Sequence, residues 1–173
     1  MTIRFDAKPR TIDRWTVLRL PEAASRKLPS RGQVAVEATL NGRRFQTVLE
    51  PDGRSGHWMR LDHRRSAADT LIVEVEPLKD WPEPDLPEDL RVALAEAPPS
   101  IRDIWSDITP MARWEWVRWI NATRNVETRR RRVEVTISKL QNGKRRPCCF
   151  NLAACTDPDL SRNGKLVDAV SGD

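Results

Sequence analysis

Alternating apolar and polar residues characterise the first 77 positions of the chain. The clearest case runs from Val34 to Leu40, where every second residue is apolar or small, which is the period of a strand with one buried face. Asn41-Gly42 follows, a pair that favours a two-residue turn because both residues adopt positive φ readily. Residues 43–50 alternate again. The pattern predicts a β-hairpin over residues 34–50.

Four more segments have the composition of strands: residues 3–7, 14–20, 57–61 and 70–75. Together with the hairpin they make six strands, at a spacing typical of a small barrel or sandwich. Residues 21–28 favour one short helix between strands, with a proline in its first turn. We therefore expect a β-barrel domain over residues 1–77.

An acidic, proline-rich stretch follows. Residues 74–89 contain four prolines, and seven acidic residues against one lysine. Proline at this density interrupts both helices and central strands. We expect residues 78–89 to form an extended strap between two parts of the chain.

The apolar period becomes helical from residue 90 onward. Leu90 and Leu94 recur at the spacing of one helix face, and Pro98-Pro99 ends that helix. Thr109-Pro110 predicts an N-cap followed by proline at the first helical position, in a helix that buries Trp116. A last helix is expected over residues 127–140. These elements predict a helical domain over residues 90–147, and we expect the polar tail at 148–173 to be flexible.

Charge is distributed unevenly along the chain. The net charge is +5, yet residues 113–146 carry 11 basic against 3 acidic side chains, and residues 1–112 carry a net −1. The longest apolar runs are far shorter than the roughly 18 residues that a membrane span needs. The first residues lack the apolar core of a secretory signal. We expect a cytoplasmic protein without membrane insertion.

Several motifs together resemble one bacterial family. They occupy residues 15–21, 36–45, 53–61, 81–90, 116–120, 127–132 and 143–149. In this combination the chain resembles the YdeI/OmpD-associated, or bacteriocin-protection, proteins. The resemblance implies an α+β protein, with a six-stranded barrel of the double-split type, a domain of unknown function, followed by a helical domain. It also implies a part in tolerance to bacteriocins or cationic antimicrobial peptides, and it supplies no catalytic residues. Ala67-Ala68-Asp69 departs from the family pattern, in which a glycine often precedes the aspartate.

The basic residues near the chain's C-terminal half are the most suggestive candidate site. They are Arg124, Arg129, Arg130, Arg131, Arg132, Arg145 and Arg146. Guanidinium groups bind oxyanions bidentately, so these residues are candidates for an anion, nucleic-acid or partner surface. Successive residues on a helix point about 100° apart, however, so four consecutive arginines form no single stripe. The alternative is that they are solvated or pair internally, for example with the acidic strap.

The cysteines and histidines give weaker signals. Cys148, Cys149 and Cys155 lie close together and indicate no disulfide framework, and their spacing to His57 and His63 matches no metal-binding motif. The basic residues before Cys148 would favour its thiolate, so this cysteine is a candidate redox thiol. We interpret His57 as a histidine at a strand edge.

Three hypotheses about function remain. The first is a non-catalytic cytoplasmic adaptor protein for bacteriocin or antimicrobial-peptide stress, which binds a protein partner through its helical half. The second is a nucleic-acid-binding protein that uses residues 113–146, whose affinity would fall steeply with salt. The third is a small enzyme with an unrecognised site. We expect no cofactor and no metal, and either a monomer or a small homo-oligomer.

Overall fold

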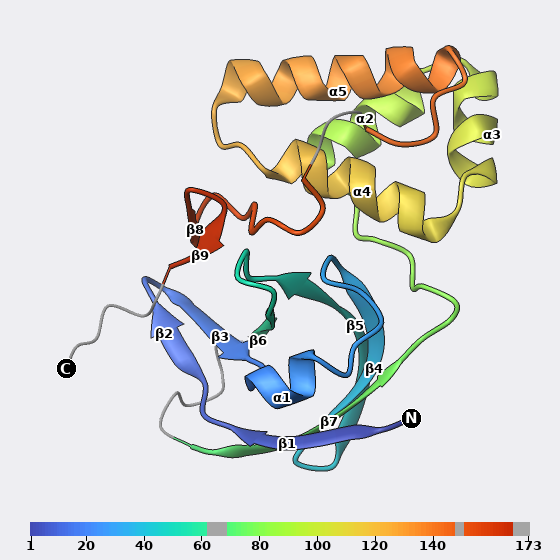
Figure 1. Ribbon diagram of the computed structural model, residues 1–173. Helices are drawn as coiled ribbons and strands as arrows, with labels where there is room; N and C mark the ends of the chain where they lie inside the picture. Colours follow the sequence, from blue (N-terminus) through green and yellow to red (C-terminus); the bar gives the residue numbers. More distant parts are fainter. Residues whose placement is uncertain (62–68, 148–150, 168–173) are drawn as a thin grey trace. The chain divides into compact units, whose positions relative to one another are not determined.

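The computed structural model describes residues 1–61, 69–147 and 151–167 (Figure 1). Its contacts divide the chain into two compact units. The first contains residues 1–81 with the described parts of 151–155 and 160–167, and the second contains 82–147 with 156–159. Strands dominate the first unit and helices the second, which confirms the α+β class.

The first unit is built around a curled antiparallel sheet. Its seven strands are β1 (Ile3–Ala7), β2 (Arg10–Ile12), β3 (Trp15–Arg19), β4 (Val34–Leu40), β5 (Arg43–Pro51), β6 (His57–Leu61) and β7 (Leu71–Pro77). They lie in the order β1-β7-β4-β5-β6-β3-β2. The sheet curves around its own core like half of a barrel, and the short helix α1 (Glu22–Ser25) lies within the curve (Figure 1).

The count of six strands was one too low. The additional strand is β2, which pairs with β3 through Thr11 and Thr16 across a turn where Asp13 has a φ of 54°. Three residues are too few for an alternating pattern to be visible in the sequence. The double-split arrangement stays a prediction.

The predicted hairpin is confirmed. β4 and β5 pair from Val34 opposite Leu49 to Leu40 opposite Arg43. Asn41 and Gly42 form the turn between them, with φ values of 46° and 88°, as the twist of a two-residue hairpin requires.

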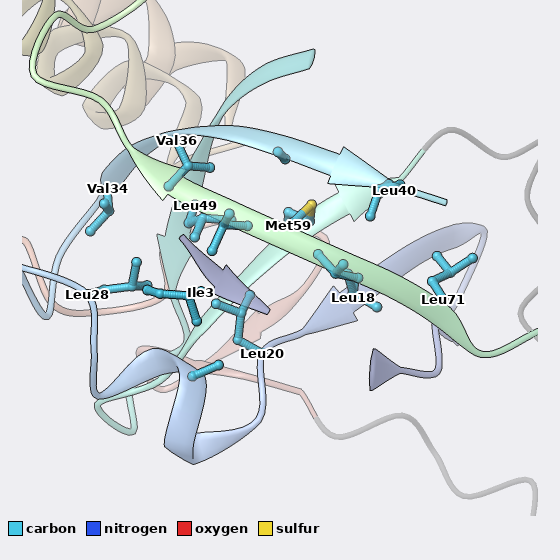
Figure 2. Close-up of a cluster of buried hydrophobic side chains, with 14 of the residues drawn as sticks. Ile3, Leu18, Leu20, Leu28, Val34, Val36, Leu40, Leu49, Met59 and Leu71 are labelled. Carbon is cyan, nitrogen blue, oxygen red and sulfur yellow. The ribbon is translucent and has the colours of Figure 1, made fainter. Parts of the chain in front are cut away.

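Apolar side chains from most strands and from α1 meet inside the curled sheet. Figure 2 shows Leu18, Leu49, Met59 and other residues of this cluster pointing toward one another. Ile3, Leu18 and Leu49 are at most 1% exposed. Burial of this apolar surface stabilises the sheet, which no single strand could maintain alone.

The described part of the second unit contains four helices. They are α2 (Glu88–Glu96), α3 (Pro99–Asp107), α4 (Pro110–Asn121) and α5 (Val126–Gln141). The Thr109 side chain accepts a hydrogen bond from the Ala112 amide at 3.1 Å, and Asn125 accepts one from the Thr128 amide at 2.9 Å. Both caps satisfy amides that the first turn of a helix leaves without partners. Trp116 is 1% exposed in the core, as predicted.

The segment from residue 151 to 167 differs from the flexible tail that we expected. It contains a small hairpin of β8 (Ser161–Arg162) and β9 (Lys165–Leu166). Cys155, Leu160 and Leu166 are buried against a cluster that includes Trp58, and the Leu166 amide donates to the Asp52 carbonyl at 2.9 Å. Apolar residues five or six positions apart form no period in the sequence, so only tertiary packing reveals their role.

Among the described residues, no helix combines the length and the apolar character needed to cross a membrane.

Candidate functional site

Arg129, the first residue of the arginine run, faces inward. Its Nε and one terminal nitrogen donate to the two carboxylate oxygens of Asp89 at 2.7 and 3.3 Å. The guanidinium also donates to the Asn121 side chain at 2.9 Å and to the Ile120 carbonyl at 3.2 Å. This residue therefore joins α5 to the start of α2 and to the end of α4.

The other three arginines of the run point in different directions, as the helical period requires. Arg130 pairs on the helix surface with Glu127 at 2.8 Å and Glu134 at 2.9 Å. Arg132 donates to the Trp119 carbonyl at 2.6 Å, and its guanidinium lies 5.2 Å from the centre of the Trp119 ring. Arg131 is exposed, and it makes no ion pair within the described part of the chain. The run is not one cationic surface.

Basic residues outside the run are paired as well. Arg124 pairs with Asp159, Arg145 with Asp107 at 3.0 Å, and Arg146 with Glu115 at 3.1 Å. Burial raises the pKa of the Glu115 carboxyl, although the charges of Arg146 and Arg118 act in the opposite direction. Six of the seven candidate arginines thus have partners inside the second unit.

Arg113, which the sequence did not indicate as a candidate residue, has a more buried side chain than the candidate arginines described above. Its side chain is 10% exposed and donates through Nε to Glu83 of the acidic stretch at 2.9 Å. Another nitrogen donates to the carbonyls of Trp105 at 3.0 Å and Ser106 at 3.2 Å, and also to that of Ile108. These carbonyls belong to the end of α3, where helical partners are lacking. Arg113 therefore fixes both the strap and α3 to α4.

A groove of about 650 Å³ lies along α2 in the second unit. It is lined by Glu88, Asp89, Val92, Ala93, Glu96 and Arg129. Glu88, Val92 and Glu96 follow each other at intervals of four positions, which places them in one stripe along the helix. The groove therefore has an apolar centre with a carboxylate at each end.

The charges at this groove are unequal. Arg129 and Asp89 neutralise each other by their contact. The pKa of Glu88 is lowered by its hydrogen bond with Arg91 and by the charge of that residue, so this carboxylate is ionised at neutral pH. Glu96 makes no ion pair among residues 69–147, and Val92 is 38% exposed. Glu88 is paired with Arg91 at 2.5 Å, so the groove combines accessible apolar surface with one carboxylate, Glu96, that has no counter-charge among the described residues.

His57, the first residue of β6, is completely buried. Its Nε2 lies 2.9 Å from the Gly32 carbonyl oxygen, and its Nδ1 lies 2.5 Å from the Ser25 hydroxyl. A carbonyl only accepts, so Nε2 carries the proton and Nδ1 accepts from Ser25. Burial lowers the pKa of His57, despite an opposing contribution from the Gly32 hydrogen bond. Ser25 is 1% exposed, so this pair connects α1 to the sheet and has little access to a substrate.

Of the three cysteines, the structure describes Cys155. Cys148, the candidate redox thiol, and Cys149 lie outside the described residues. Cys155 is buried, with 2% of its surface exposed. In residues 1–61, 69–147 and 151–167, no three His, Cys, Asp or Glu side chains are grouped in a way that could hold a metal ion.

Comparison with known families gives two matches that divide the chain as the fold does. Residues 2–72 match a domain of unknown function, DUF1905. Residues 83–143 match the OmdA family, described as bacteriocin-protection, YdeI or OmpD-associated. No curated protein matches the chain. The chain therefore matches the YdeI/OmpD-associated family in its helical region and a domain of unknown function in its N-terminal region, as the sequence resemblance implied.

Proposed function

We propose that this chain is a non-catalytic cytoplasmic binding protein in tolerance to bacteriocins or cationic antimicrobial peptides. It acts by binding a cationic, amphipathic helical segment of a peptide or protein partner in the groove along α2. The observation that carries the proposal is the stripe of Glu88, Val92 and Glu96 at this groove. The family's description as bacteriocin-protection proteins supports the biological theme.

The geometry of the stripe defines the partner's chemistry. The two glutamates are eight positions apart on the α-helix, so their backbones lie about 12 Å apart along the helix axis. A helical partner with basic residues seven or eight positions apart, and an apolar residue between them, would match both carboxylates and the apolar centre. Charge complementarity would favour such a segment and would repel an anionic one.

Pairing of the arginines weakens the case for nucleic acid. Phosphate binding by Arg129, Arg132 or Arg146 would require each to exchange an existing acceptor for a phosphate. Nucleic-acid affinity depends on the neutralisation of several phosphates by basic side chains, and Arg131 alone would neutralise only one. Binding through the acidic groove is therefore the better-supported activity.

The proposal can be tested with a labelled helical peptide that carries two lysines eight residues apart around a leucine. Its affinity for the full chain would be measured by fluorescence anisotropy at low salt, for the wild type and for Glu88→Gln with Glu96→Gln. We expect this double variant to weaken binding about fivefold or more, since it removes two exposed charge contacts.

Glu127→Gln with Glu134→Gln is the matched control, because it removes two exposed carboxylates from the same unit on α5. The control should change the affinity less than about twofold. Equal weakening by both double variants would show that only net charge matters and would refute a groove-specific site. Tighter binding of a single-stranded oligonucleotide than of the peptide would favour the nucleic-acid hypothesis instead.

A further inference from the structure

The first unit contains two cavities that share a wall. One, of about 580 Å³, lies between α1, Arg31 and the loop at residues 52–56. The other, of about 550 Å³, lies at the turn between β1 and β2. Arg19 and Leu20, at the end of β3, line both. A side chain at this shared wall can contact a ligand that extends into either cavity.

Arg19 is held in place by an ion pair with Asp52. Its guanidinium donates to the Asp52 Oδ2 atom at 3.2 Å. The Oδ1 atom of the same carboxylate accepts from the amides of Arg54 at 2.7 Å and Gly56 at 2.8 Å. Burial raises the pKa of Asp52, but these hydrogen bonds and Arg19 outweigh it and the pKa lies below its usual value. The carboxylate therefore stays ionised and orients Arg19 before any ligand binds.

The lining of the two cavities is predominantly basic. Six basic side chains, Lys8, Arg10, Arg19, Arg26, Arg31 and Arg54, face three acidic ones, Asp6, Glu22 and Asp52. Arg31 is used by the fold, since it donates to the carbonyls of Ser25 at 2.7 Å and Ser55 at 2.9 Å. Lys8 and Arg10 are exposed and make no ion pair within the described residues. These two cations are available for an external anion.

We propose that this pair of cavities binds a small molecule with two or more phosphoryl groups. Arginine binds phosphate oxygens through two parallel hydrogen bonds, and lysine adds a mobile point charge. Lys8 and Arg10 would bind the phosphates, and Arg19 would orient them from the shared wall. Each cavity has the volume of a typical small-molecule site, which leaves room for an organic group beside Leu20 and Pro21. This site lies in the first unit and is independent of the groove on α2.

Inorganic pyrophosphate and ADP serve as the probes, with the full chain in an isothermal titration at about 50 mM salt. Lys8→Ala with Arg10→Ala should weaken pyrophosphate binding about tenfold or more, because each residue supplies a charge-assisted contact. Lys79→Ala with Arg43→Ala is the matched control, since it removes one exposed lysine and one exposed arginine of the same unit outside both cavities. This control should change the affinity less than about twofold.

Circular dichroism of both double variants checks the fold, which exposed substitutions should leave unchanged. Tighter binding of ADP than of pyrophosphate would identify a nucleotide as the ligand, and equal binding would point to the phosphoryl groups alone. The proposal is overturned if neither probe binds at millimolar concentration, or if both double variants weaken binding equally. It is also overturned if a short single-stranded DNA binds more tightly than either probe at the same residues.

Discussion

Arg129 and Asp89 are 40 positions apart in the sequence, and the Nε atom of the arginine lies 2.7 Å from a carboxylate oxygen of the aspartate. This ion pair connects the arginine run to the end of the acidic stretch, which forms the first turn of α2. It explains why the most basic segment of the chain does not present all of its charge to solvent. The acidic stretch supplies acceptors to α4 in the same way, through Glu83 and Arg113.

Replacement of Arg129 should destabilise the second unit much more than replacement of its neighbour. Arg129→Met removes the contacts to Asp89, Asn121 and the Ile120 carbonyl, with an expected loss of about 2 kcal/mol in the free energy of unfolding. Arg130→Met removes only exposed pairs on the same helix and should change stability little. Urea denaturation followed by circular dichroism compares the two. Similar losses for both would mean that the run stabilises the unit by its charge alone.

Arg113→Met should be more damaging than removal of its acidic partner. The substitution leaves the carbonyls at the end of α3 without their donor, and we expect a loss of about 2–4 kcal/mol. Glu83 is 63% exposed, so Glu83→Gln should cost less than about 1 kcal/mol. Thermal unfolding of both variants, followed by tryptophan fluorescence, tests this order. The reverse order would show that the ion pair, rather than the capping of α3, is the important contact.

Gly53→Ala should destabilise the first unit strongly. Gly53 has a φ of 78°, and a Cβ atom at this position would overlap the carbonyl group of Gly164. We expect a loss of at least about 2–3 kcal/mol, from the strained backbone together with the displaced 151–167 segment. Gly42→Ala is the matched control, because its φ is 88° but nothing lies near its Cβ, and it should cost about 1 kcal/mol. Equal effects in urea denaturation would contradict the close contact between Gly53 and Gly164.

Stability of the first unit should decrease as the pH falls below about 6.5, the pKa of histidine in an unfolded chain. His57 has a lowered pKa in the folded state because it is buried. As the pH falls through 6.5, the unfolded chain binds a proton that the folded chain excludes, so unfolding becomes easier until the folded pKa is reached. Asp52 contributes in a separate window below pH 3.8, since its pKa is lowered from that value. Urea denaturation between pH 5 and 8 should show this slope, and His57→Gln should reduce it. An unchanged slope in the variant would assign the effect to another group.

The sequence by itself determined the local elements. Asn41-Gly42 specifies its turn because few pairs adopt positive φ at both positions. Thr109-Pro110 specifies the start of α4 because the cap and the first helical residue act on adjacent backbone atoms. Some of the motifs that carry the family resemblance lie within such elements, for example residues 36–45 in the β4–β5 hairpin and 116–120 in α4, and the matches to residues 2–72 and 83–143 confirm that resemblance.

Only the tertiary structure decided which charges meet. The arginines were recognisable as a candidate site, but several of their partners lie more than 30 residues away, as in Arg129 with Asp89 and Arg146 with Glu115. The burial of Leu160 and Leu166, and the contact between His57 and Ser25, depend equally on folding. Pairing, burial and cavities arise where segments that are distant in the sequence come into contact. A local pattern of hydrophobic and polar residues does not predict such long-range contacts.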